Sequence, residues 1–162
     1  MTSYIELSLQ QWRKHILFPF VTLELAKERL FQLEQERDQL KQISDQLIRE
    51  WQSFFPRSSV PIYLTRVSDR SLSTLRWRRS KTHADKASQI SFDKELLEYF
   101  HIEKQRYIVM KFESLRLDLN HQLAVILYEC QRLKSYIHHA RLLSELRKSI
   151  NTPSHREDHG KE

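Results

Sequence analysis

Residues 20 to 55 carry apolar side chains at the spacing of an amphipathic helix. In a heptad register every d position is apolar, and two of the five a positions are polar. The d positions are Ala26, Leu33, Leu40, Leu47 and Phe54, and the a positions are Leu23, Leu30, Arg37, Ser44 and Trp51. Between them lie charged residues and glutamines. The pattern predicts a coiled-coil helix over 20–55 that ends at Pro56, preceded by a separate helical segment over 1–19.

Residues 92 to 150 show the helical period again, and more regularly. Ten of twelve positions spaced alternately by three and four between 102 and 140 are apolar, with Gln105 and Arg116 as the exceptions. Cys130 lies in this stripe and is expected to be a small buried hydrophobe. The pattern predicts one long C-terminal helix over 92–150, and the polar residues 151–162 predict a disordered tail.

The predicted C-terminal helix has a second apolar row besides the stripe. Its members are Phe100, Tyr107, Leu117, Ala124 and Leu127. Two helices of one chain cannot cover both rows, because each row needs its own packing partner. The pattern therefore favours a homodimer.

Between the two helical regions the apolar period changes to that of strands. Residues 60–67, VPIYLTRV, and 72–79, LSTLRWRR, are rich in β-branched and aromatic residues and flank the polar sequence SDRS. These features predict a β-hairpin. In its second strand Leu75 and Trp77 share the face expected to be buried, and Thr74, Arg76 and Arg78 share the other. Residues 80–91 are expected to be a mobile basic loop.

Together these elements predict a mainly α fold. It is a long antiparallel helical hairpin or coiled coil, into which a two-stranded antiparallel β-ribbon is inserted. The composition agrees, because one glycine and four prolines in 162 residues leave few positions for tight turns. The length suits a single domain over 1–150.

Charge is distributed unevenly along this chain. The formal net charge is +6, and residues 57–86 alone hold eight cations against two carboxylates, which is the entire surplus. Six of the eight are arginines, whose planar guanidinium groups match phosphate oxygens. A two-stranded ribbon also fits the major groove of DNA. The segment 57–86 is therefore expected to bind duplex DNA, with Thr65 and Thr74 adding neutral contacts.

The residues expected to contact DNA are the cations of the ribbon and its loop. They are Arg66, Arg70, Arg76, Arg78, Arg79, Lys81 and Lys86. Three alternatives remain open. The chain can be a coiled-coil scaffold or adaptor whose ribbon docks an acidic protein, or an RNA-binding protein. The arginines can also form a solvated strand face that protects the edge from aggregation.

No motif in the sequence indicates an enzyme. A single glycine excludes glycine-rich nucleotide loops, and there is no Gly-x-Ser-x-Gly element. Cys130 with His138 and His139 does not match a zinc-ligand spacing. Carboxylates in runs such as ELEQERD are interpreted as flank charges of the coiled coil, and no catalytic role is expected for Glu98, Glu103 or Glu113. We therefore expect no catalytic residue, no metal and no cofactor.

Three features predict a cytoplasmic protein. A lone cysteine cannot form an internal disulfide, and no basic stretch followed by an apolar stretch opens the sequence as in a secretory signal. No apolar stretch approaches the roughly 18 residues of a membrane span, so no membrane partner is expected.

The ribbon tetrapeptide Leu75-Arg76-Trp77-Arg78, followed by Gln105-Arg106 and its downstream apolar heptads, resembles a known group of proteins. These are small proteins of conjugative plasmids and integrative conjugative elements, among them the MobI-like mobilisation factors. The resemblance covers residues 30–140 in architecture and the tetrapeptide in detail. It implies an accessory DNA-binding protein that assists a relaxase, or another transfer protein, at the origin of transfer. No catalytic residue is carried over.

Overall fold

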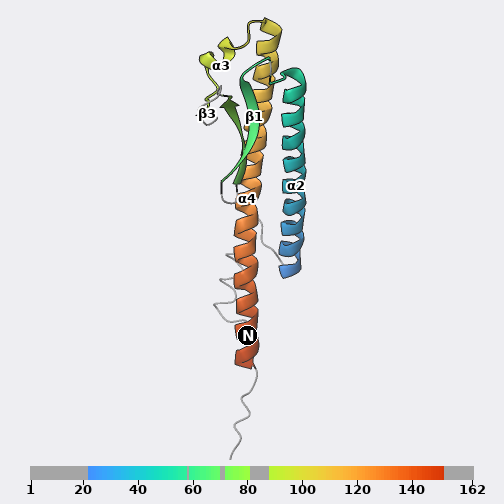
Figure 1. Cartoon of the computed structure of the whole chain (residues 1–162). Coiled ribbons are helices and arrows are strands. Elements are labelled where there is room, and N and C mark those ends of the chain that lie inside the picture. Colours follow the sequence, from blue (N-terminus) through green and yellow to red (C-terminus); the bar gives the residue numbers. More distant parts are fainter. Residues whose placement is uncertain (1–21, 58, 70–71, 81–87, 152–162) are drawn as a thin grey trace, which may run out of the picture. The chain divides into compact units, whose positions relative to one another are not determined.

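The computed structural model describes residues 22–57, 59–69, 72–80 and 88–151 (Figure 1). Their elements, in chain order, are α2 (Leu23–Phe54), β1 (Ile62–Asp69), β2 (Leu72–Arg79), β3 (Ser88–Gln89), α3 (Lys94–Glu98) and α4 (Glu103–Asn151). The predicted fold class is confirmed: the chain is mainly helical, with a long helix and an antiparallel β-ribbon. It divides into two compact units, one of residues 32–131 and one of both chain ends.

The unit of residues 32–131 is built on one aromatic and aliphatic core. Trp51 of α2 lies at its centre, with its ring 4.6 Å from that of Trp77 on β2 and 5.3 Å from that of Phe112 on α4. Phe100, which precedes α4, completes the cluster at 6.1 Å from Trp51. All four side chains are buried, so α2, the sheet and α4 are joined by one shared core.

Helix α2 follows the predicted heptads over most of its length. Leu33, Leu47 and Trp51 are buried as expected. At the C-terminal end the pattern departs from the heptad, since Phe54 is 59% exposed and Phe55 is 4% exposed. The helix ends at Phe54, but the N–H of Phe55 still donates to the carbonyl of Trp51 at 2.8 Å, so the Phe55 ring lies one turn after that of Trp51 and 4.5 Å from it.

Helix α4 buries the stripe that the sequence predicts. Within residues 103–131, Val109, Phe112, Leu119, Leu123 and Cys130 are all buried. Cys130 is a free cysteine, as expected. The second row behaves differently, because Phe100 is buried while Tyr107 and Leu117 are 60% and 53% exposed.

The β-ribbon is antiparallel with a continuous register from Ile62 opposite Arg79 to Asp69 opposite Leu72. Strand β1 thus extends two residues into the polar connection expected at 68–71. Leu75 and Trp77 face the helices and are buried, which confirms the predicted inner face. A third strand, β3, pairs with Arg78 and Arg79, so Ser88 and Gln89 of the expected loop belong to the sheet.

The predicted continuous helix over 92–150 is wrong at its start. Asp93 caps the short helix α3 by accepting a hydrogen bond from the backbone N–H of Leu96, and the backbone leaves the helix at Tyr99. Leu96 and Phe100 are thereby buried in the core, which a straight extension of α4 does not allow. Arg106 supports the junction by donating from Nε to the carbonyl of Phe100 at 2.7 Å.

The unit of the chain ends is described over residues 22–31 and 132–151, which belong to α2 and α4. Ala26, Leu133 and Ile137 are buried there. The helix expected over 1–19 and the tail expected over 152–162 lie outside the described residues. Within the described part of the chain, no helix is both long and apolar enough to cross a membrane.

Candidate nucleic-acid interface

The outer face of the sheet, which points away from the helices, carries two of the predicted arginines. Strand alternation puts Arg76 and Arg78 on the face opposite to the buried Leu75 and Trp77. In the register Arg76 lies opposite Thr65, and Arg78 lies opposite Tyr63. We call the surface made by Tyr63, Thr65, Thr74, Arg76 and Arg78 the outer face.

Arg76 is held on the outer face by neutral groups. Its Nη1 donates to Oε1 of Gln89 at 3.0 Å, and its Nε donates to the hydroxyl of Thr74 at 3.3 Å. The guanidinium group is therefore oriented without a carboxylate, and its positive charge is not neutralised by these contacts. Gln89 can serve because β3 brings it beside β2.

Arg57 adds a third cation that the list of expected contacts omitted. It precedes β1, is exposed, and stacks its guanidinium carbon 5.2 Å from the centre of the Tyr63 ring. Because Tyr63 shares the outer face with Arg78, Arg57 extends the cationic surface toward the start of β1. In the sequence, Arg57 is one of the eight cations of residues 57–86, and this was the only indication that it belongs with the other arginines.

Arg66 lies on the other face of the sheet. Strand alternation places it on the same face as the buried Ile62 and Leu64, and its side chain reaches α2. There Nη2 forms an ion pair with Oδ1 of Asp45 at 2.6 Å and donates to the carbonyl of Lys41 at 2.6 Å. The structure therefore does not bring Arg66 together with Arg76 and Arg78. Instead, Arg66 connects the ribbon to α2.

Arg79 is the last residue of β2, and strand alternation places it on the same face as Leu75 and Trp77. It is exposed, and its Nη1 donates to the hydroxyl of Tyr99 at 3.2 Å. This hydrogen bond raises the pKa of the Arg79 guanidinium above its ordinary value. Arg79 thus flanks the outer face at the strand end.

Arg70, Lys81 and Lys86 lie outside the described residues. They belong to the two segments of the chain that adjoin the ends of β2. Their expected contacts with DNA stay predictions.

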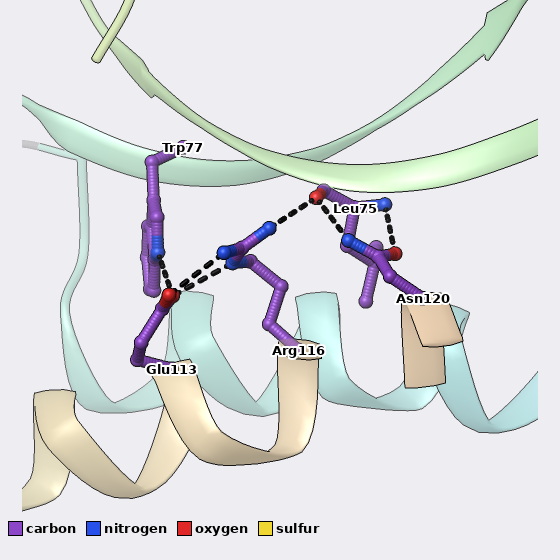
Figure 2. A network of polar contacts seen from close by, with 5 residues as sticks. All are labelled: Leu75, Trp77, Glu113, Arg116 and Asn120. Atoms are coloured by element: carbon purple, nitrogen blue, oxygen red, sulfur yellow. Dashed lines mark hydrogen bonds and ion pairs between the residues drawn. The ribbon is translucent and has the colours of Figure 1, made fainter. Parts of the chain in front are cut away.

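The inner side of β2 is fixed by a polar network on α4 (Figure 2). Nε1 of Trp77 donates to Glu113 at 2.7 Å, and Arg116 binds both oxygens of that carboxylate at 2.7 Å. Arg116 also donates from Nη1 to the carbonyl of Leu75 at 3.1 Å. The buried Glu113 therefore has its charge paired, and it positions the strand that presents Arg76 and Arg78.

Asn120 completes this network at the edge of β2. Its side-chain amide accepts from the N–H of Leu75 at 2.8 Å and donates to the carbonyl of the same residue at 2.9 Å (Figure 2). Among the described residues, strand β3 pairs with Arg78 and Arg79 and does not extend to Leu75. The amide thus takes the place of a neighbouring strand.

The sequence carries a signal for part of this network. Arg116 is the one charged residue in the apolar stripe, and Glu113 precedes it by the three residues that bring side chains together on a helix. A charged pair at such a position indicates a buried ion pair. Trp77 as its further partner could not be read from the sequence, because 36 residues separate it from Glu113.

Among the described residues, no group of three or more His, Cys, Asp or Glu side chains is arranged to hold a metal ion. Comparisons with protein-family models, with curated proteins and with solved structures find no match for this chain.

Proposed function

We propose that this chain is a non-enzymatic, cytoplasmic accessory protein that binds duplex DNA through the outer face of its sheet. The observation that carries the proposal is the set of arginines on and beside that face, of which Arg57 and Arg76 contact neutral groups. An unneutralised guanidinium group attracts phosphate more strongly than one already paired with a carboxylate. Each phosphate it binds releases condensed counterions.

The rigidity of β2 supports the same function. The strand is anchored from below by Trp77, Glu113 and Asn120, so the outer side chains are held before DNA arrives. A preorganised surface loses less conformational entropy on binding than a loop does. A short twisted ribbon of this kind can enter the major groove, where arginine recognises guanine edges or phosphates.

The resemblance of the LRWR tetrapeptide and its helical surroundings to mobilisation factors extends this proposal. On that basis the DNA is an origin of transfer, and a relaxase is the enzyme that the chain assists. The resemblance adds no residue to the outer face.

The proposal is tested by titrating fluorescent duplex DNA with the full chain at several salt concentrations. We expect log affinity to fall linearly with log salt, and the variant Arg76→Ala with Arg78→Ala to bind more weakly. Each lost phosphate contact lowers the slope by about 0.9, so the double variant should lose about two units. The matched control is Arg49→Ala with Arg147→Ala, which removes the same charge from exposed helix positions.

Equal weakening by the control pair would mean that total charge, and not the outer face, governs binding. Tighter binding of single- or double-stranded RNA in the same titration would replace DNA by RNA as the ligand. Absence of nucleic-acid binding at low salt would favour the scaffold function, in which the ribbon docks an acidic protein.

A further inference from the structure

The helix pair also has a face that the sheet does not cover. On α4, Glu113, Arg116 and Asn120 contact the sheet, and the residues two positions further on are Leu115, Asp118 and Gln122. Two residues correspond to roughly 200° of helical rotation, so this second set points away from the sheet. On α2 the same offset separates Asp45, which pairs with Arg66, from Leu47.

A groove of about 380 Å³ runs between α2 and α4 on this uncovered face. Five leucine and isoleucine side chains line it, and Ile43 and Leu115 are each 49% exposed. The α2 side extends from Leu40 to Glu50, which is about 15 Å at 1.5 Å per residue. This length accommodates two to three turns of a docked helix.

The rim of the groove is negatively charged, although the whole chain is basic. Its polar lining consists of Glu50, Asp118, Gln46 and Gln122. Within the described residues, Glu50 accepts a hydrogen bond from Gln46 at 2.9 Å, and neither Glu50 nor Asp118 forms an ion pair. Both carboxylates are exposed and are therefore available to cations from outside.

We propose that this groove docks an amphipathic helix of another protein, one with leucine-like residues on one side flanked by lysine or arginine. The apolar floor matches the stripe of such a helix, and the two carboxylates match its flanking cations. A second copy of the same groove fits poorly, because face-to-face packing would bring four carboxylates together without a cation. The proposal is independent of DNA binding, since the groove and the outer face lie on opposite sides of the unit.

The test uses the full chain and two labelled model peptides in fluorescence polarisation. One is a 14-residue helix of leucine and lysine, with leucines at i, i+3, i+4 and i+7; the other has glutamate in place of lysine. A chain of net charge +6 attracts the glutamate peptide if charge alone decides. We expect the reverse, with at least tenfold tighter binding of the lysine peptide.

Variants locate the binding. Asp118→Lys and Leu115→Lys should each weaken the lysine peptide at least tenfold, whereas Glu98→Lys on α3 should change it less than twofold. All three replace exposed side chains, and circular dichroism checks that they remain folded. Preference for the glutamate peptide, no binding, or equal binding by the groove variants would overturn the proposal. A change from dimer to monomer in Leu115→Lys would also overturn it, by assigning the groove to a second copy.

Discussion

At the scale of single residues, Glu113 is one of the side chains that hold the ribbon on α4. Its carboxylate satisfies Trp77 and Arg116 together, and all three side chains lie between α4 and the sheet. A buried charge of this kind is tolerated because a bidentate guanidinium group and a neutral donor compensate for the lost water.

We expect Glu113→Gln to lower the free energy of unfolding by about 1–3 kcal/mol, because the Arg116 charge stays in a mostly buried position without its carboxylate. Urea denaturation measures the change. The control Asp118→Asn removes an exposed carboxylate from the same helix and should alter stability by no more than about 0.5 kcal/mol. Equal effects of the two substitutions would show that the network contributes no stability.

At the scale of elements, each helix covers one edge of the ribbon. Nε1 of Trp51 on α2 donates to the carbonyl of Ile62 on β1 at 3.3 Å, and Asn120 on α4 binds both backbone groups of Leu75 on β2. Two strands alone are marginal in water, so this support explains why so short a ribbon is stable.

Replacement of the Asn120 side chain should release the edge of β2. We expect Asn120→Ala to cost about 1–2 kcal/mol of stability, since two hydrogen bonds to Leu75 are lost and its backbone groups remain partly buried. Amide hydrogen exchange gives the specific measurement: the N–H of Leu75 should exchange faster. The control Gln122→Ala replaces an exposed side chain two residues away and should change neither the stability nor the exchange rate of the Leu75 N–H. If this N–H exchanges more slowly or at an unchanged rate in Asn120→Ala, the role assigned to the amide is wrong.

At the scale of the whole molecule, a large apolar surface remains exposed on α4. Tyr107, Met110 and Leu117 lie within one sector of the helix and are each more than half exposed. This sector includes members of the second apolar row from which the sequence predicts a homodimer. It lies outside the lining of the groove described above.

We therefore expect analytical ultracentrifugation to give a mass twice that of the monomer, which is 19.7 kDa. Tyr107→Lys with Leu117→Lys should shift it to the monomer, because two charges would have to be buried in the interface. Ile102→Lys, an exposed apolar residue before α4, is the control and should leave the dimer intact. A wild-type chain at 19.7 kDa would exclude the dimer.

Local pattern alone determined the two helices, the ribbon and the inward orientation of Trp77. Helical and strand periods depend on neighbours a few residues apart, so the burial of Val109, Leu119 and Leu75 could be predicted. Alternation also predicts that Arg66 shares the face of Ile62 and Leu64. The prediction that Arg66 binds DNA beside Arg76 rested on charge alone and did not take this alternation into account.

Only the tertiary structure decided which arginines share a surface and what holds it in place. The pairing of β3 with β2, and the contacts of Asp45 with Arg66 and of Glu113 with Trp77, join residues that are distant in sequence. Such pairs form only when the core has brought their elements together, so no local period encodes them.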